Sequence, residues 1–362
     1  MASHQVLLEP AAREFRADEA QSVLAAALDA GLTLPHGCKD GACGSCKGRV
    51  RSGRVIHGPH AAAALSAEEE AAGLALFCCA HAQTDLVIEV RLATGLDGIV
   101  ARKMPARIER IERPASDVAI VRLTLAAGEQ MLFRAGQYVD FILGGGQRRS
   151  YSIASMPGAG GPLEFHVRHM PGGVFTDALF GRAAPAVQER GIVRIEGPLG
   201  TFHLREDSDR PIVLLASGTG FAPLKAIAET IFAKGLNRDD PATGRRARPV
   251  VLYWGARTRP DLYLDALPRR WQAEQPNFHY VPVLSEATGA QADAYWSGRT
   301  GLVHEAVLQD LPDLSGHDVY ACGAPVMVEA ARRDFIQACG LPMEQFFSDA
   351  FLSRADLPAG SS

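Results

Sequence analysis

Residues 37–47 read GCKDGACGSCK and bring three of the chain's seven cysteines into one short, glycine-rich loop. These are Cys38, Cys43 and Cys46, and Cys78 follows after 31 intervening residues. The spacing C-x4-C-x2-C with one distant cysteine is that of plant-type 2Fe–2S ligation. Small residues between the cysteines let the backbone wrap a cluster and direct N–H groups at its sulfur atoms. The loop therefore predicts a 2Fe–2S cluster held by Cys38, Cys43, Cys46 and Cys78.

A zinc site and a set of buried structural cysteines are the alternatives to a cluster. Zinc sites usually show paired C-x2-C units, and structural cysteines need no glycine-rich setting. The fourth ligand is either Cys78 or Cys79. The segment resembles plant-type ferredoxins, in which the last ligand lies seven residues before an Asp that opens the final strand, as Cys78 does before Asp85. Cys78 is therefore favoured, and Cys79 is expected to be a small buried residue.

The composition is that of a globular chain long enough for two or three domains. The chain has 362 residues, of which 47% are hydrophobic, and a net charge of −4, so it has no basic footprint for nucleic acid. No apolar run approaches the roughly 20 residues that span a bilayer. The first residues lack the basic and then apolar order of a signal peptide, and an odd cysteine count argues against a disulfide framework. We expect a cytoplasmic protein without a membrane span.

The cysteine-rich part is expected to form a unit over residues 1–95. Asp18 is the expected N-cap of its helix, and Gly31 lies just past the helix end. The elements predicted from composition and periodicity are strands at 5–9 and 86–90, a helix at about 18–30 and a linker at 92–103.

The middle of the chain, residues 102–206, is expected to contain strands and turns. Short β-rich segments separated by Gly and Pro clusters indicate a barrel or a sandwich. These segments are 118–125, 137–143 and 163–168.

The last part, residues 207–352, alternates strands with helices, which predicts a parallel, doubly wound sheet. The polar segment 237–248 is expected to be a solvated surface loop rather than a binding patch. The predicted elements are strands at 211–216, 249–254, 278–283 and 317–321 and a helix at 223–234.

The segment Arg149-Ser-Tyr151-Ser152 ends a strand and carries side chains suited to a flavin. An arginine pairs with a phosphate, a tyrosine ring covers the isoalloxazine face, and a serine hydroxyl hydrogen-bonds N5, where hydride arrives. Downstream, Gly172, Gly173, Val174 and Thr176 open a helix whose N–H groups would face a pyrophosphate. A surface strand end is the alternative for Arg149 and Tyr151, but their place between a cysteine-rich unit and a strand–helix unit favours the flavin.

Residues 216–223, ASGTGFAP, join a buried-type strand to a helix. Gly218, Thr219 and Gly220 would allow a pyrophosphate close to the backbone, where the helix N-terminus supplies the field. Pro223 suits the first helical turn. The pattern G-T-G-x-x-P differs from the dinucleotide fingerprint G-x-G-x-x-G.

Taken together, these motifs resemble the ferredoxin–NADP reductase superfamily over nearly the whole chain. RSYS matches its R-x-Y-[ST] flavin motif, GGVFT its diphosphate motif and GTGxxP its pyridine-nucleotide motif. His166, Val167 and Arg168 occupy the place where that family lines the flavin. Two further matches are Cys322-Gly323-x-x-x-Met327, whose Cys lies near the nicotinamide in the family, and a closing segment with Asp349 and Phe351. Many members carry Glu where Asp349 stands, and Met327 suits a helix core as well as a ligand site.

The resemblance implies a multidomain α+β and α/β chain. Its domains would be a β-grasp 2Fe–2S ferredoxin (1–95), an antiparallel β-barrel for FAD (102–206) and a parallel-sheet NAD(P) domain (207–352). This order is similar to the reductase components of phenol, benzoate and methane oxygenases and to the reductase of 3,6-dideoxyhexose synthesis. Relatives with a C-terminal ferredoxin typically use FMN, so the order here implies FAD.

The implied activity is oxidation of NADH at FAD, with electrons passing singly through the cluster to a separate oxygenase or iron–sulfur dehydratase. Ser152, Cys322 and Asp349 are the expected catalytic residues. Asp261 suits a ribose hydroxyl and would repel a 2′-phosphate, which favours NADH over NADPH. The alternative function is a redox-sensing or scaffold module that binds the cofactors without turnover.

Overall fold

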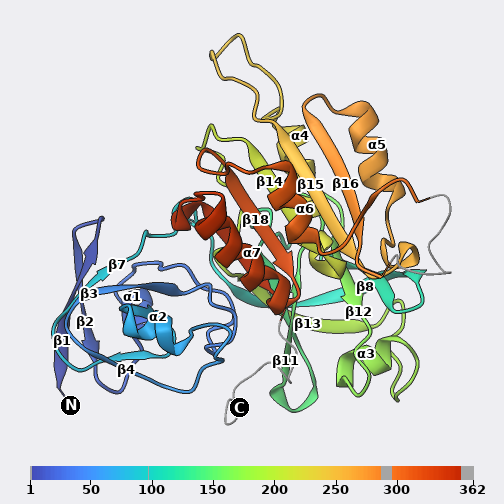
Figure 1. Cartoon of the computed structure of the whole chain (residues 1–362). Coiled ribbons are helices and arrows are strands. Elements are labelled where there is room, and N and C mark those ends of the chain that lie inside the picture. The colour runs from blue at the N-terminus through green and yellow to red at the C-terminus, as the bar shows by residue number, and fades with distance from the viewer. Residues whose placement is uncertain (1, 97, 287–295, 352–362) are drawn as a thin grey trace.

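The computed structural model describes residues 2–96, 98–286 and 296–351, which form three sheet-based units in chain order (Figure 1). Each unit has a hydrophobic core of its own. The predicted fold class is confirmed: a β-grasp unit comes first, then an antiparallel barrel, then a parallel sheet. The domain limits stay predictions, and residue 352, the predicted end of the third domain, lies outside the described residues.

The first unit is a mixed five-stranded sheet in the order β2-β1-β7-β3-β5, and helix α1 packs against it. Strands β1 and β7 are parallel at its centre, and the other neighbours are antiparallel. A two-stranded sheet of β4 and β6 and the short helix α2 complete the unit. The bounds are β1 Ser3–Glu9, β2 Arg13–Asp18, α1 Val23–Asp29, β3 Lys47–Ser52, β4 Val55–His57, α2 Ala67–Ala71, β5 Leu74–Leu76, β6 Ala80–Ala82 and β7 Leu86–Glu89.

The start of α1 differs from the prediction. Asp18 is not its N-cap, because Asp18 is the last residue of β2 and pairs with Ser3 across the ladder. The cap is Ser22, whose hydroxyl oxygen accepts a hydrogen bond from the Ala25 N–H at 3.2 Å. Gly31 lies just beyond the helix end, as expected. Asp18 and Ser22 are both good capping residues. The pairing of β2 with β1 places Asp18 in the strand and leaves Ser22 as the cap.

The second unit is a six-stranded antiparallel sheet in the order β11-β10-β13-β8-β9-β12. A bridge between Ile153 and Phe165 links the two edge strands and closes the sheet into a barrel. Closure removes the free edges that an open sheet would expose. The bounds are β8 Arg102–Ala115, β9 Val118–Leu125, β10 Tyr138–Ile142, β11 Arg148–Ser152, β12 Leu163–Arg168, α3 Val174–Leu179 and β13 Ile192–Leu199.

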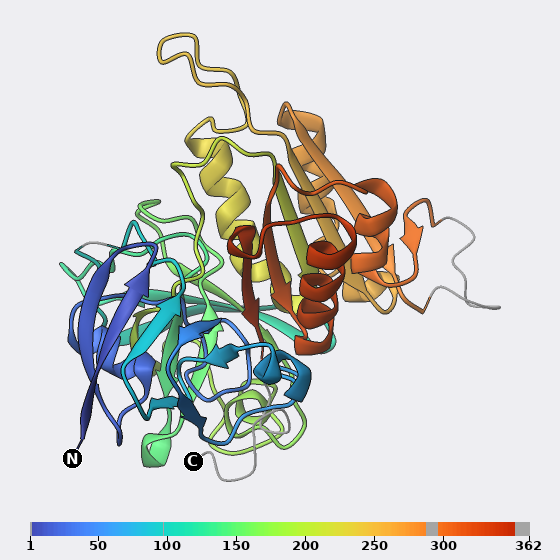
Figure 2. The same ribbon diagram turned by 60° about the vertical axis from the view of Figure 1, so that its left-hand side comes forward.

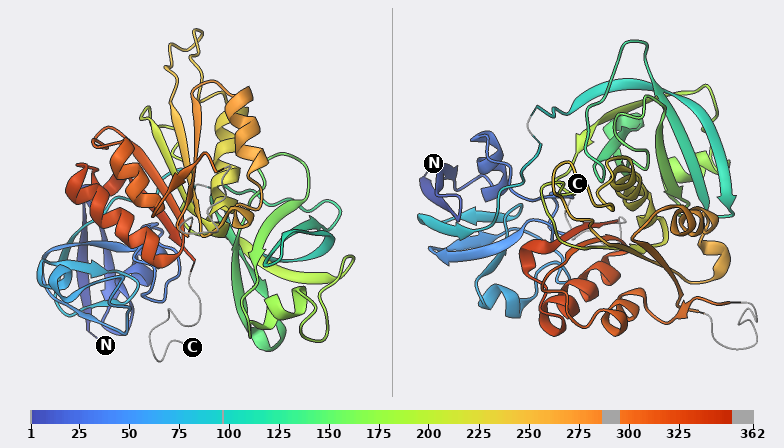
Figure 3. Two further views of the ribbon diagram at one scale, coloured as in Figure 1. Left: turned by 45° about the vertical axis from the view of Figure 1, so that its right-hand side comes forward. Right: turned by 90° about the horizontal axis from the view of Figure 1, so that it is seen from above.

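The third unit is a parallel sheet in the order β17-β16-β15-β14-β18-β19. Both of its faces are covered, so β14 is apolar at every position of its first five residues. Ile212 and Leu214 pack with α4, whereas Val213 and Leu215 pack with α6 and α7 on the other face (Figure 3). The bounds are β14 Ile212–Ser217, α4 Phe221–Ala233, β15 Val250–Ala256, α5 Ala266–Glu274, β16 Phe278–Leu284, β17 Arg299–Thr300, α6 Val303–Asp310, β18 Asp318–Gly323, α7 Pro325–Ala338 and β19 Phe346–Ala350.

The strand order of this sheet reverses between β14 and β18. At such a switch point the loops after the two strands diverge and leave a crevice, where open parallel sheets bind ligands. The predicted GTG turn follows β14, and Gly323 ends β18. The topology therefore places both predicted nucleotide motifs at the position that the fold reserves for a ligand.

The segment after β7 is hydrogen-bonded both to its own unit and to the flavin barrel. The Ala93 N–H donates to the Thr33 carbonyl at 2.8 Å, and the Arg134 guanidinium donates to the Gly95 carbonyl at 2.8 Å. Figures 1 and 2 show the first unit lying beside α7 of the third. Across the described ranges, none of the helices combines the length and apolarity that crossing a bilayer requires.

The polar segment 237–248 is only in part the solvated loop that was predicted. Arg248 at its end is 1% exposed and pairs with the fully buried Asp318 at 2.8 Å. Its guanidinium also donates to the carbonyls of Arg205 at 2.8 Å and Arg210 at 2.7 Å. Arg246, two residues earlier, has a side chain that is 92% exposed. One arginine of the segment is therefore structural, which composition cannot reveal.

Replacing Arg248 by Ala is expected to lower the free energy of unfolding by about 3–5 kcal/mol, because it leaves the Asp318 carboxylate buried without its partner. All three tryptophans lie in the third unit, so urea unfolding followed by tryptophan fluorescence reports on this sheet. The matched control is Arg246→Ala, expected to change stability by less than about 0.5 kcal/mol. Equal losses in both variants would contradict the structural role of Arg248.

Candidate functional site

The four predicted cluster ligands lie together as two pairs. The Cys46 and Cys78 sulfur atoms are 3.1 Å apart, and the Cys38 N–H points at the Cys43 sulfur at 3.4 Å. Each iron of a 2Fe–2S cluster takes two thiolates, so two pairs are the donor set that it needs. In the described part of the chain no group of three or more His, Cys, Asp or Glu side chains could hold a single ion.

The loop around these thiols has the polarity that a cluster needs. The hydrogen bond between the Cys38 and Cys43 thiols lowers the pKa of Cys43 to about 5 and, together with burial, raises the pKa of Cys38, so one thiolate of this pair is favoured. The Asp40 N–H is 3.4 Å from the Cys38 sulfur. Thiols in two pairs, with backbone N–H groups directed at sulfur, fit a 2Fe–2S cluster.

Cys79 lies beside the cluster ligands but does not pair with Cys46. Its sulfur is 3.5 Å from that of Cys78, and it packs against Gly41, where an added Cβ would come within 2.6 Å of the sulfur. Cys79 is 8% exposed. The pairing of Cys78 with Cys46 favours Cys78 as the fourth ligand, which stays a prediction.

The flavin motif occupies β11, with Tyr151 and Ser152 at its end. The Tyr151 ring contacts Phe141 of β10 edge-on at 5.0 Å and Phe175 of α3 at 5.6 Å between centroids. These aromatic contacts join the two predicted flavin segments, RSYS and GGVFT. Among the described residues, Arg149 has only local partners, the Arg148 carbonyl at 2.6 Å and Gln147 at 3.4 Å. Its side chain is therefore available for a phosphate.

Fewer groups of the GGVFT segment are available to a diphosphate than predicted. The Gly172 N–H donates to the Asp177 carboxylate at 3.0 Å, and the Gly173 N–H donates to the Met170 carbonyl at 2.9 Å. The Thr176 hydroxyl also donates to Met170 at 2.9 Å. The first-turn amides of α3, beginning at Val174, need no partner within the helix and are the groups left for an anion.

The side chains of His166 and Val167 are buried and contact other residues of the protein. Val167 is fully buried in the barrel core. His166 is 5% exposed, and its ring nitrogens are 2.8 Å from the Tyr263 hydroxyl and 3.0 Å from Glu164. These two residues offer their backbone, but not their side chains, to a flavin. His166 instead joins the barrel to the nucleotide unit.

The nucleotide motif forms a tight turn at the end of β14. An added Cβ on Gly220 would lie 2.0 Å from the Cys322 carbonyl oxygen, so only glycine allows this approach of β14 to β18. Thr219 is 8% exposed, and the Gly218 carbonyl accepts a hydrogen bond from the Trp254 ring at 2.9 Å. Pro223 lies in the first turn of α4, as predicted. Met327 is 8% exposed in the core beside α7, which agrees with the helix-core reading.

Asp261 has a local structural role. Its carboxylate accepts hydrogen bonds from the Thr258 N–H and hydroxyl, both at 3.1 Å, which caps a short 3-10 turn. The Arg257 guanidinium lies 3.5 Å away. A ribose contact would use the remaining carboxylate oxygen, and this contact stays a prediction.

The flavin, nicotinamide and closing segments meet at one point, although they are far apart in sequence. The Ser152 hydroxyl donates to the Asp349 carboxylate at 3.3 Å. The Cys322 thiol donates to the Asp349 carbonyl at 3.2 Å, and the Phe351 N–H donates to the Gly323 carbonyl at 2.8 Å. Burial, reinforced by the charge of Cys43, raises the pKa of Asp349 to about 7. The three predicted catalytic residues are thus directly connected.

Two further residues lie at this junction. Tyr138 lies opposite Ser152 in the ladder of β10 and β11, and its hydroxyl donates to the Gly37 carbonyl of the cluster loop at 3.2 Å. The Arg168 guanidinium lies against Gly218, whose added Cβ would be 3.3 Å away, and its Nε is 3.5 Å from the Asp117 carboxylate. Tyr138 was not predicted from the sequence. Arg168 was expected beside the flavin with His166 and Val167, and its contact with Gly218 is visible only from the packing of two domains.

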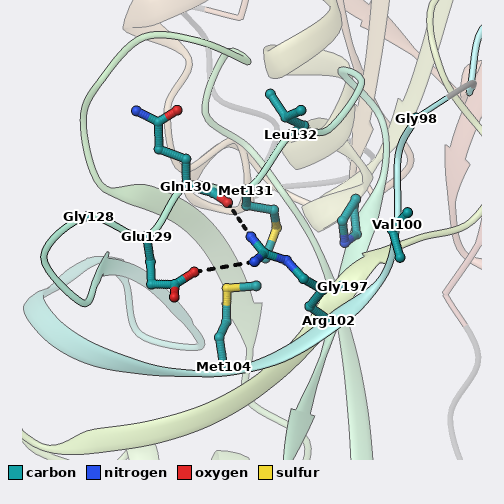
Figure 4. Close-up of a pocket in the computed structure, with 11 residues that line it drawn as sticks. Gly98, Val100, Arg102, Met104, Gly128, Glu129, Gln130, Met131, Leu132 and Gly197 are labelled. Atoms are coloured by element: carbon teal, nitrogen blue, oxygen red, sulfur yellow. Dashed lines mark hydrogen bonds and ion pairs between the residues drawn. The ribbon is translucent and has the colours of Figure 1, made fainter.

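A separate pocket of about 490 Å³ lies on the flavin barrel and contains none of the predicted site residues. Figure 4 shows Arg102 at its centre, pairing with Glu129 at 3.5 Å and donating to the Gln130 carbonyl at 2.8 Å. The charged groups of the pocket therefore bind one another, and the pocket takes no part in the site.

Family models cover each unit. The 2Fe-2S iron-sulfur cluster binding domain matches residues 6–83, the oxidoreductase FAD-binding domain 105–204 and the oxidoreductase NAD-binding domain 214–333. The fold and the site thus define an iron–sulfur flavoprotein oxidoreductase. The chain belongs to the ferredoxin–NADP reductase superfamily, among the members whose 2Fe–2S domain precedes the flavin and nucleotide domains.

Relatives match along nearly their full length. The CDP-6-deoxy-L-threo-D-glycero-4-hexulose-3-dehydrase reductase of Yersinia pseudotuberculosis is 42% identical over 97% of this chain and 99% of the relative. Reductase component 1 of the terephthalate 1,2-dioxygenase of a Comamonas species is 31% identical over 99% of both chains. The crystal structure of the Amycolatopsis cytochrome P450 reductase GcoB has a TM-score of 0.68 at 35% identity and covers 96% of this chain and 98% of that one.

The fourth ligand can be tested by iron and acid-labile sulfide analysis of two variants. Cys78→Ala is expected to lose the cluster, because one iron would keep only a single thiolate. Cys79→Ala serves as the matched control, since it removes a neighbouring buried thiol of the same size, and is expected to keep a full complement of iron. A cluster that survives the first change and not the second would assign the ligand to Cys79.

Proposed function

We propose that this chain oxidises NADH and delivers the electrons singly to a separate oxygenase or iron–sulfur dehydratase. The observation that carries the proposal is the hydrogen-bonded junction at Asp349, which connects the flavin residue Ser152 with Cys322 of the nucleotide domain. The cluster loop adjoins the same junction through Tyr138. An enzyme that takes a hydride and releases single electrons needs these three sites side by side.

Bound FAD would supply the conversion between two-electron and one-electron chemistry. The protein orients the reactants around it. Arg149 and the first-turn amides of α3 would hold its phosphates, Tyr151 would cover one ring face and the Ser152 hydroxyl would bind N5. Cys322, fully buried at the end of β18, would line the nicotinamide position, and Arg168 beside Gly218 would face the nucleotide pyrophosphate.

The favoured electron acceptor is an iron–sulfur dehydratase that acts on a nucleotide-linked deoxyhexulose. The 42% identical relative is named as the reductase of a CDP-6-deoxy-hexulose dehydrase, whereas relatives named as components of a dioxygenase or a monooxygenase are 31–34% identical. Adding purified dehydratase or oxygenase components to the reduced protein and following cluster reoxidation separates the two classes. A cytoplasmic location also stays a prediction.

NADH is the proposed donor in preference to NADPH, because a 2′-phosphate beside the Asp261 carboxylate would meet like charge. The measurement is kcat/KM for each nucleotide with ferricyanide as acceptor. A higher value for NADPH would contradict the preference.

The proposed electron order predicts that Cys43→Ser affects ferricyanide reduction and cytochrome c reduction differently. Ferricyanide reduction, which the flavin supports alone, is expected to persist, because Cys43 holds only the cluster. Cytochrome c reduction, which requires the cluster, is expected to be lost. Equal loss of both activities would contradict the order, and bound cofactors without NADH oxidation by any acceptor would support the sensor alternative, which the relatives do not favour.

Asp349 and Ser152 predict a pH dependence of hydride transfer. Below pH 7 the protonated Asp349 carboxyl donates to the Ser152 oxygen and frees the serine hydrogen for N5, whereas above pH 7 the serine must donate to the carboxylate. Flavin reduction by NADH is therefore expected to accelerate as the pH falls through about 7. In Asp349→Asn the amide donates at every pH, so the dependence should disappear. An unchanged inflection in this variant would exclude the role.

A further inference from the structure

The cluster loop, residues 37–46, is held against the rest of the protein at two separate points. At one end Thr201, just after β13, accepts from the His36 N–H at 2.8 Å and donates to the His36 carbonyl at 2.9 Å. At the other end the contact is made by Arg332 of α7. The flavin domain thus holds one end of the loop and the nucleotide domain holds the other.

Arg332 bridges the cluster loop and strand β19 with the two ends of its guanidinium. One terminal nitrogen donates to the Gly44 carbonyl at 3.2 Å, and the other donates to the Ser348 hydroxyl at 2.9 Å. The guanidinium also lies over the Phe346 ring, 5.4 Å from its centroid. The Ser45 hydroxyl adds a direct bond to the Ser348 carbonyl at 3.3 Å. A planar fork of this kind suits two acceptors at fixed positions.

The loop is shaped to receive this side chain. Gly44 has a φ of +72°, and an added Cβ would lie 2.8 Å from the Arg332 nitrogen. The Arg332 side chain is only 11% exposed and has Glu329 at 3.7 Å. Glu329 in turn lies 3.8 Å from the Lys47 ammonium group just after the loop. Contacts this well enclosed are stronger than exposed ion pairs.

The contact lies one residue from the catalytic junction. Ser348 directly precedes Asp349, whose carboxylate accepts from Ser152 at 3.3 Å. Without the contact to Ser348, the loop would be held to the flavin domain only at its first residues, through Thr201 and Tyr138, and the segment with Cys43 and Cys46 could shift relative to the flavin strand. The same contacts form part of the wall of an open cleft of about 1490 Å³ between the first and third units, so solvent could enter if they broke.

We propose that Arg332 is a positioning residue for electron transfer from the flavin to the cluster. It holds the cluster loop against Ser348, and thereby fixes the distance between the cluster and the flavin strand, without touching either cofactor. The inference rests on the proposed function. It adds a residue that affects only the electron transfer from the flavin to the cluster. The hydride step uses Ser152, Cys322 and Asp349, to which Arg332 makes no hydrogen bond among the described contacts, so flavin reduction is expected to keep its rate.

The test is anaerobic rapid mixing of the holoprotein with NADH, with flavin bleaching and cluster bleaching followed separately. Arg332→Ala is expected to leave the rate of flavin reduction unchanged and to slow cluster reduction by roughly tenfold or more, because it removes two charge-assisted hydrogen bonds. Arg332→Lys keeps the charge but not the fork, so an intermediate rate is expected. The matched control is Arg333→Ala on the same helix, whose side chain is 58% exposed and pairs with Asp334.

Iron content and the visible spectrum of each variant establish that the cluster is assembled. Normal cluster reduction in Arg332→Ala, or equal slowing in Arg333→Ala, would overturn the inference. If Arg332→Ala lost its cluster, the test would use Arg332→Lys instead. An Arg332→Lys protein with a full complement of iron and a normal rate of cluster reduction would also overturn the inference. Absence of flavin bleaching in the unmodified protein would instead contradict the proposed function, so the two failures are distinguishable.

Discussion

The dipeptide Ser348–Asp349 on β19 is the constraint around which the domains are arranged. Its polar groups bind Ser45 of the cluster loop, Ser152 of the flavin strand and Cys322 of the nucleotide strand. A protein that takes electrons in pairs and releases them singly must hold three binding sites within a short distance, and here two adjacent residues connect them. Moving any one domain would break at least one of these bonds.

The barrel and the third unit share apolar as well as polar contacts. Val118, Ala135, Phe202 and Leu204 pack in the same hydrophobic core as β14 and α4. The junction of the barrel with the third unit includes a buried chain of Glu164, His166 and Tyr263. Burial alone would raise the pKa of Glu164, but the hydrogen bond from His166 and the charges of Lys225 and Arg122 hold it well below its usual range. Its charge is therefore kept at neutral pH, and the pairing fixes how the nucleotide strand faces the flavin strand.

Short-range sequence patterns located the parts of the site well. The strands at 118–125 and 163–168 coincide with β9 and β12, because alternation and turn residues are local signals. The cysteine spacing and the glycine turn after β14 could also be predicted, because a cluster or a phosphate needs small residues at fixed intervals. The start of α1 and the burial of Arg248 could not be predicted from the sequence, because each depends on a partner that is distant along the chain.

Local sequence patterns therefore identified the three domain types and the order of the cofactor sites, and they predicted residues for each site. The packing of the domains was needed to show which of those residues meet, that the side chains of His166 and Val167 are buried within the protein, and that Tyr138, Arg168 and Arg332 lie at the junctions. This is because the residues of a cofactor motif lie within one loop, so their spacing can be recognised in the sequence. A junction is made by side chains from different domains, and their proximity is set by packing that no local pattern records.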